Sequence, residues 1–319
     1  MAIDFTNIDK IISLNADDMD IIVQPRVRWI TLNKKAEKSG LFFPINPGPT
    51  ISLILTATIS GIVGTSCSST NIIRYRTIKD WVINLIVILA DRTIVKTHLY
   101  SKSAAGYNLI NLFIGSKGTL GLVIEITLKL IVIPKETSVT IVTFPTIRDA
   151  VVVALKVIRA GVPVAISVIN RSGFTLKKWK EVLTMFFKFS GTKAGSIDVI
   201  VLLLRLPNII EVFKKEIDDL GLTASILGYV RDGNFHKSIL YNGKNIKERA
   251  AVEKCINDIV NRALEMEGTY TSKYRIRLGK KESLLKELRL ETISIIKSIK
   301  EALDPYWLIN PKKIMDISK

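Results

Sequence analysis

Two segments rich in glycine, serine and threonine carry residue types that could hold a phosphorylated ligand. The first comprises Pro47-Gly48, Thr65-Ser-Cys-Ser-Ser-Thr-Asn71 and Arg74-Tyr75. Small residues let a backbone approach a ligand closely, and exposed N–H groups with nearby hydroxyls donate hydrogen bonds to a pyrophosphate. The same composition also fits an ordinary Ser/Thr-rich surface loop, and both interpretations stay open. The candidate binding residues are Pro47, Gly48, Thr65, Cys67, Ser68, Thr70, Asn71, Arg74 and Tyr75.

The second segment is a glycine turn, Gly115-Ser-Lys-Gly-Thr-Leu-Gly121, that leads directly into the β-branched run Leu122-Val-Ile-Glu-Ile126. It is not a Walker A loop, because no Gly-Lys-Ser/Thr follows its glycines. It also differs from the dinucleotide Rossmann fingerprint, which precedes a helix rather than a strand. The pattern is nevertheless more specific than a lone pair of glycines. Its candidate binding residues are Gly118, Thr119, Gly121 and Val123.

The elements that must position these segments are expected to be mostly strands. Residues 20–25 predict a strand, and residues 29–39 have the apolar spacing of a helix that Gly40 closes. A β-hairpin is expected from residues 81–90 and 94–97, which flank a short polar turn. We expect a ligand-binding loop, beside a buried strand, in the uncharged segment 39–73. A last β-branched run, residues 120–133, ends at Pro134, where a domain boundary is expected.

The second half of the chain predicts a layered module of strands and helices. A Thr cap and a closing Gly161 mark the helix 146–160, and the long amphipathic helix 246–267 ends at Gly268. The remaining elements expected are strands at 138–144, 165–169 and 223–230 and helices at 207–220 and 281–303. The fold class predicted is therefore α+β.

Composition limits the classes of function. The 319 residues carry a net charge of +17, but the basic residues are scattered among apolar ones, so we expect no nucleic-acid partner. Two cysteines make no disulfide framework. The N-terminal stretch is acidic, so no transit peptide is visible. The apolar run 51–59 is too short for the roughly 20 residues of a membrane span, so none is expected.

Several motifs in order resemble the FAD-linked D-lactate dehydrogenases that pass electrons to cytochrome c, which have the flavin-binding fold of vanillyl-alcohol oxidase. The resemblance rests on Gly40-Leu-Phe-Phe-Pro-Ile-Asn-Pro-Gly48, on residues 65–77 and on the run from Lys102 to Gly121. It extends to Ala302-Leu-Asp-Pro305 and to Asn310-Pro311, which adds Asn310 to the cofactor-binding candidates. It implies FAD as cofactor, D-lactate or a similar D-2-hydroxy acid as substrate, cytochrome c as electron acceptor and a mitochondrial location.

The resemblance also predicts the domain organisation. Residues 1–136 correspond to a PCMH-type FAD-binding domain that starts after the family's N-terminal Gly-rich loop and is therefore truncated. Residues 137–319 correspond to the C-terminal oxidase domain, a reduced ferredoxin-like cap that is shortened between Arg171 and Phe186. Three positions of the flavin loops differ from the family pattern, with Ser69 and Arg76 in place of glycine and Lys117 in place of glutamate. Weakened FAD binding is the consequence we expect.

A third motif, Gly228-Tyr-Val-Arg-Asp-Gly-Asn-Phe-His236, resembles the strand end where the family holds a divalent metal with two histidines. The first histidine is replaced by Tyr229, so His236 alone remains as a histidine ligand, and we expect the metal to be lost. The family's Gly-Glu-His-Gly corresponds to Ser272-Lys-Tyr-Arg275, which puts Tyr274 in place of the catalytic histidine. His236, Asn234 and Tyr274 are the catalytic candidates.

Two alternatives to an active dehydrogenase stay open. One is a catalytically inactive remnant or fragment of the family, with weakened FAD and metal sites. The other is a basic interaction protein that uses the net charge of +17. Flavin colour in the purified protein separates the first interpretation from the others, and salt-sensitive binding to an anionic polymer favours the last.

Overall fold

The computed structural model divides the chain into two compact units, and each is described by itself. The first unit contains residues 1–139 and 273–319, and the second contains residues 140–272. The division after residue 139 lies near the predicted boundary, whereas residues 273–319, predicted as part of the second domain, belong to the first unit. The structure describes residues 3–47, 55–67, 72–98, 106–135, 142, 144–160, 168–171, 192–202, 204–229, 234–242, 245–269, 287–311 and 313–314.

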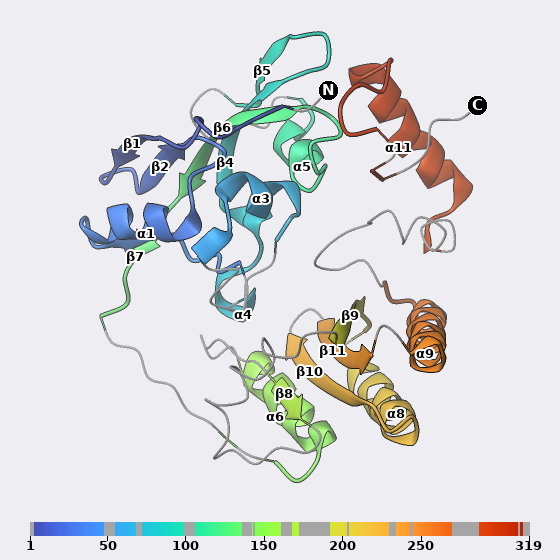
Figure 1. The fold of residues 1–319 in the computed structure, drawn as a ribbon. Helices are drawn as coiled ribbons and strands as arrows, with labels where there is room; N and C mark the ends of the chain where they lie inside the picture. The colour runs from blue at the N-terminus through green and yellow to red at the C-terminus, as the bar shows by residue number, and fades with distance from the viewer. Residues whose placement is uncertain are drawn as a thin grey trace. The chain divides into compact units, whose positions relative to one another are not determined.

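The first unit is built on a five-stranded antiparallel sheet in the order β1-β2-β6-β4-β5 (Figure 1). The β4-β5 pairing confirms the predicted hairpin. The predicted strand 120–133 is instead two strands, because the Leu130 N–H donates to the Met19 carbonyl and a separate β3-β7 sheet follows. The strands are β1 (Ile11–Asn15), β2 (Asp20–Val23), β3 (Leu41–Phe42), β4 (Val82–Ile88), β5 (Ile94–Lys96), β6 (Leu122–Lys129) and β7 (Ile131–Val132).

The helices of the first unit are mostly short. The predicted helix at 29–39 is confirmed as α1, and Gly40 follows it with a φ of +70°. Residues 59–64, expected as part of a loop, form α3 because the Thr58 side chain caps its first turn and Ile59, Ile62 and Val63 are buried. The helices are α1 (Trp29–Glu37), α3 (Ile59–Gly64), α4 (Ile72–Tyr75), α5 (Leu109–Phe113) and α11 (Leu290–Leu303), with a 3-10 turn at Ile78–Asp80.

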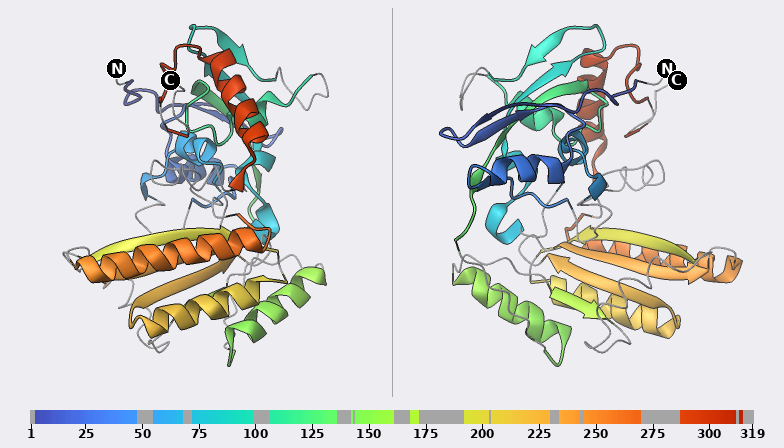
Figure 2. Two further views of the ribbon diagram at one scale, coloured as in Figure 1. Left: turned by 90° about the vertical axis from the view of Figure 1, so that its right-hand side faces the viewer. Right: turned by 60° about the vertical axis from the view of Figure 1, so that its left-hand side comes forward.

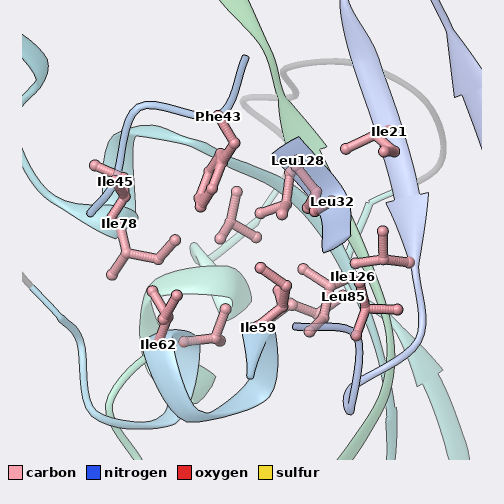
Figure 3. Packing of buried hydrophobic residues seen from close by; sticks show 14 of the residues in the cluster. Ile21, Leu32, Phe43, Ile45, Ile59, Ile62, Ile78, Leu85, Ile126 and Leu128 are labelled. Carbon is pink, nitrogen blue, oxygen red and sulfur yellow. The ribbon is translucent and has the colours of Figure 1, made fainter. Parts of the chain in front are cut away.

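One apolar core holds the first unit together. Leu32 of α1, Ile59 of α3 and Phe43, which follows β3, are fully buried. They share the core with Ile126 of β6 and Leu85 of β4 (Figure 3). Each such side chain contributes about 1.5–3 kcal/mol by leaving water. The helix predicted at 281–303 is confirmed from Leu290 onward as α11, which begins after the extended Arg289, and residues 281–286 lie outside the described residues.

The second unit is a two-layer arrangement of helices on an antiparallel sheet, in the order β8-β10-β11-β9 (Figure 2). Helix α6 begins at the predicted Thr146 cap, and Asn245 caps α9 in the same way. The predicted strand at 138–144 lies mostly outside the described residues. The elements are α6 (Ile147–Arg159), β8 (Val168–Arg171), β9 (Thr192–Ile200), α8 (Leu206–Asp219), β10 (Thr223–Tyr229), β11 (Asn234–Asn242) and α9 (Ile246–Glu265).

The helices that the structure describes in this unit lie in the order α6, α8, α9, and α9 packs against both β9 and β11. Their apolar faces form a second core around Phe213 and Ile259. No described helix of either unit combines the length and the apolar character that crossing a membrane requires.

Candidate functional site

The glycine turn (residues 115–121) joins α5 to β6 and has a left-handed backbone. Lys117 and Gly118 have φ values of +55° and +65°, and the Thr119 N–H donates to the Ser116 carbonyl over 3.1 Å. Two central residues with positive φ are the signature of a type I′ turn. The turn is fastened to α3, because Gly115 N–H donates to Val63 O over 2.8 Å and Lys117 N–H donates to Gly64 O over 3.0 Å.

Two amides of the glycine turn are available to a ligand. Within the part of the chain that the structure describes, the N–H groups of Gly118 and Leu120 donate to no protein acceptor. A half-buried N–H without a partner is costly, and successive N–H groups in such a turn form an anion-binding concavity. The turn therefore fits an anionic group such as a phosphate.

Gly121 lets the glycine turn lie directly against β4. A Cβ atom on Gly121 would lie 2.5 Å from Val87 Cγ1 and 3.1 Å from the Ile88 carbonyl oxygen. Only a residue without a Cβ fits this space. Val123, two residues further, is paired with Val87 in the sheet.

The first predicted binding segment reaches the glycine turn through α3. Thr65 follows α3 directly, and the buried Cys67 Sγ lies 3.7 Å from the Pro47 carbonyl oxygen. The hydroxyls of Thr65 and Thr119 donate within the protein, to Gly61 O and Ser116 O, each over 2.7 Å. Among the described residues of these two segments, backbone N–H groups are thus the principal donors. The candidates Gly48, Ser68, Thr70 and Asn71 lie outside the described residues.

The C-terminal segment of the chain contacts the glycine turn through two side chains. The Asn310 amide nitrogen donates to the Lys117 carbonyl over 2.8 Å and to the Gly118 carbonyl over 3.3 Å. Lys300 Nζ donates to the Thr119 carbonyl over 2.6 Å, to the Ile309 carbonyl over 3.0 Å and to the Asp304 carboxylate. Lys300 is 4% exposed and Asp304 is fully buried, so the C-terminal segment anchors the turn with a buried ion pair.

Asp304 is held in its charged form. Burial raises the pKa of Asp304, but hydrogen bonds from Lys300, from Ile309 N–H and from Leu308 N–H outweigh it, so the pKa lies below the usual 3.8. Sequence reasoning missed Lys300 and Asp304 as part of the site. Their opposite charges at a spacing of four residues, just before Pro305, are the signal that could have indicated them.

Arg74 and Tyr75 lie at a different place from the glycine turn. They line a hollow of about 300 Å³ together with Arg76, Asp80, Trp81, Lys129, Leu130 and Ile131. Gly121 immediately precedes the eight-residue strand β6 and Lys129 ends it, so the two are roughly 26 Å apart at about 3.3 Å per residue. The predicted cofactor-binding residues therefore fall into two groups in the structure.

The candidate catalytic residues belong to the β10-β11 hairpin and to a segment beyond it. Asn234 begins β11 opposite Tyr229, and His236 is paired with Leu227 on one side and Asp198 on the other. Tyr274 lies outside the described residues. Among the residues that the structure does describe, no group of three or more His, Cys, Asp or Glu residues could hold a metal ion.

Two family models match the chain. Residues 1–98 match the FAD binding domain, and residues 175–314 match the C-terminal domain of FAD linked oxidases. A solved structure of alkyldihydroxyacetonephosphate synthase has a TM-score of 0.65 at 16% identity, over 96% of this chain and 67% of that one. This likeness shows the fold. The class of protein defined by the fold and the glycine turn is thus the FAD-linked oxidases.

Curated relatives narrow the class. The probable mitochondrial D-lactate dehydrogenase of Danio rerio is 32% identical over 98% of this chain and 74% of its own length. The mitochondrial D-lactate dehydrogenases (cytochrome) of Kluyveromyces lactis and Arabidopsis thaliana are 34% and 33% identical over 97% and 99% of this chain. The chain spans 64% and 65% of the lengths of these two. It belongs to the FAD-linked D-lactate dehydrogenase family.

Proposed function

We propose that this chain binds FAD and oxidises D-lactate or a related D-2-hydroxy acid, slowly compared with its relatives, with cytochrome c as the final electron acceptor and the mitochondrion as its location. The observation that carries the proposal is the pair of unpartnered amides, Gly118 N–H and Leu120 N–H, in the glycine turn. They supply the donors that a pyrophosphate needs. The relatives' names supply the substrate and the acceptor.

The fit of the site to FAD rests on its backbone. The positive φ of Gly118 and the close packing of Gly121 against β4 fix the backbone that carries the free amides. When bound, FAD supplies the acceptor for the hydride from C2 of the hydroxy acid. Two replacements at family glycine positions and Lys117 at the glutamate position weaken this binding without removing the amide donors.

The substrate half of the proposal depends on the β10-β11 hairpin. His236 is one of only two histidines in the sequence, and an imidazole titrates near neutral pH. We assign it the proton of the substrate hydroxyl, with Asn234, two residues earlier in β11, as a further polar group for the substrate. Tyr274 carries a phenol, and we assign it the role of hydrogen-bond donor to the substrate oxygen rather than of base.

Slow turnover follows from the missing groups. Tyr229, Lys273 and Tyr274 stand where the resemblance places a histidine, a carboxylate and a histidine. Without these ligands a divalent metal has no tight site, and the substrate hydroxyl loses the Lewis acid that would acidify it. The inactive remnant is the limiting case of the same proposal, in which FAD binds but no electrons are transferred.

The test uses the purified chain with FAD. Titration followed by quenching of flavin fluorescence measures binding, and anaerobic addition of D-lactate measures bleaching of the flavin absorption. We expect saturable FAD binding and bleaching that is slow with D-lactate and absent with L-lactate. Elemental analysis after dialysis against zinc or manganese should find no equimolar metal. An absence of FAD binding would sink the proposal, and rapid bleaching would show that the substituted positions are dispensable.

A further inference from the structure

The two free N–H groups of the glycine turn belong to peptide units whose carbonyl oxygens accept hydrogen bonds from side chains of the C-terminal segment. A peptide unit is planar and trans, so its C=O and its N–H point in opposite directions. Lys300 Nζ holds the Thr119 carbonyl, which shares its peptide plane with the Leu120 N–H. The Asn310 amide holds the Lys117 carbonyl, which shares its plane with the Gly118 N–H. Each contact therefore turns one free N–H away from the C-terminal segment.

We propose that Lys300, Asp304 and Asn310 are positioning residues that orient the Gly118 and Leu120 amides as a pair of donors for one anionic group. That the anion is the diphosphate of FAD rests on the proposed function above. Asn310, a direct cofactor ligand in the sequence-based prediction, then acts from behind the turn. Nothing in the family models or in the names of the relatives assigns such a role to these side chains.

Asp304 acts through Lys300. Its carboxylate accepts hydrogen bonds from the Leu308 and Ile309 amides at 2.9 and 2.8 Å as well as from Lys300. The same lysine donates to the Ile309 carbonyl and lies 5.6 Å from the Trp307 ring. The Lys300 ammonium group is thus held in place by residues of the C-terminal segment. From there it donates to the Thr119 carbonyl over 2.6 Å. Preorganised donors of this kind bind an anion without reorientation.

A neighbouring and more exposed pair, at the end of the same helix, offers a control. Lys297 and Glu301 have the same four-residue spacing as Lys300 and Asp304, but their side chains are 28% and 48% exposed. The variant Lys300→Met/Asp304→Asn removes the buried charges together and leaves an acceptor for the Leu308 or Ile309 amide. The control Lys297→Met/Glu301→Gln removes an exposed pair of the same chemistry. Asn310→Gly removes the second contact without any change of charge, and its φ of +44° suits glycine.

Two readouts test the proposal on the full chain. The first is FAD affinity, measured by flavin fluorescence. Lys300→Met/Asp304→Asn and Asn310→Gly should each weaken it by about tenfold or more, the effect of misplacing a charge-assisted hydrogen bond, while the control stays within about twofold. The second is amide hydrogen exchange of the FAD-free protein. Gly115, Lys117 and Thr119, whose amides are hydrogen-bonded, should exchange faster in both variants but not in the control.

The outcomes separate this proposal from the proposed function. If the unmodified chain binds no FAD, the function fails, and exchange in the turn decides alone whether the C-terminal residues hold it. If FAD binds and both variants bind it as tightly as the unmodified chain does, the positioning role is overturned. Should the double variant not fold, Asn310→Gly still decides, because it leaves the buried ion pair in place.

Discussion

The glycine turn and the β10-β11 hairpin respond differently to substitution. At the glycine turn the donors are backbone N–H groups, so Lys117 can replace the family's glutamate while the backbone keeps its left-handed form. At the hairpin the proposed chemistry belongs to side chains, and a phenol such as that of Tyr229 cannot do what an imidazole does at neutral pH. A site made of backbone tolerates changes of side chain, provided that the packing behind it is kept. A site made of ionisable side chains loses its chemistry with one or two replacements.

The largest expected effect is a gain of turnover when the side-chain site is restored. Tyr229→His/Lys273→Glu/Tyr274→His restores the residue types that the resemblance assigns to metal binding and proton transfer, and a positioned base alone contributes roughly 10²–10⁴-fold. We expect D-lactate to bleach the flavin faster by about that factor when manganese or zinc is supplied. Stopped-flow absorption measures it, with L-lactate as the control. Equal rates in the two proteins would mean that these positions do not carry the chemistry.

The next largest effect concerns the buried Lys300–Asp304 ion pair, which holds the glycine turn. Lys300→Met leaves the Asp304 carboxylate buried without its cation, which costs about 3–5 kcal/mol. Urea unfolding followed by tryptophan emission measures this, because Trp29, Trp81 and Trp307 all belong to the first unit. Lys297→Met on the exposed pair should change the midpoint little, with a cost below about 1 kcal/mol. Similar losses in the two variants would contradict the distinction between the pairs.

Gly121→Ala tests the packing that the backbone site requires. The added methyl would meet Val87 and the Ile88 carbonyl, so the turn or β4 must shift, at about 1–3 kcal/mol. Gly64→Ala is the matched control, since the nearest atom to its Cβ is Lys117 Cα at 3.9 Å. We expect weaker FAD binding and a lower urea midpoint for Gly121→Ala alone. A tolerated alanine at residue 121 would refute the close approach of the turn to β4.

Acid should weaken the first unit through Asp304. The folded-state pKa of Asp304 is lowered, so its contribution to stability is fully present above the unfolded value of 3.8 and is lost as the pH falls through the folded pKa. Asp304→Asn should therefore show a smaller fall in the urea midpoint between about pH 6 and about pH 3 than the unmodified chain. The pKa of Glu211 is also lowered, by its hydrogen bond from Arg148, but this pair is exposed. Glu211→Gln should change the acid response much less.

The sequence predicted those elements whose signals are local. Helix α6 has its Thr146 cap next to its first turn, and the hairpin β4-β5 has its polar turn between two apolar runs. Strand β9 was missed because Gly195 and Asp198 interrupt its pattern and its pairing is with β11, a distant part of the chain. Helix α3 was missed because its glycines are typical of loops, whereas buried contacts of its apolar residues favour the helix.

The candidate site was predictable only as a motif. The glycine turn was found from its residues, but its free amides depend on φ values and on hydrogen bonds to α3. The buried ion pair was harder to predict, since Lys300 and the Thr119 carbonyl that it contacts are 181 residues apart in the sequence. A lysine is seldom fully buried, so composition alone gives no reason to place it there. A charged side chain can be buried only where hydrogen-bond acceptors and an opposite charge surround it, and these come from distant parts of the chain.

The smallest effect expected is at Arg76, which stands in place of a family glycine with a φ of +58°. A left-handed conformation costs a non-glycine residue about 1 kcal/mol, so Arg76→Gly should recover part of that in stability. Loss of the exposed Arg76–Asp80 ion pair, at 3.6 Å, offsets little of the gain. Arg92→Gly is the matched control, because Arg92 has a φ of +72° in the β4-β5 turn.

Arg76→Gly and Arg92→Gly should both raise the urea midpoint slightly, by the equivalent of about 0.5 kcal/mol, because both relieve the same backbone strain. Only Arg76→Gly should also tighten FAD binding, since residue 76 follows the first binding segment and residue 92 does not. Isothermal titration with FAD separates the two effects. If Arg92→Gly tightened FAD binding equally, the gain would come from general stability. If neither did, the backbone site would tolerate substitution at this glycine position too, and the contrast between the two kinds of site would be stronger than proposed.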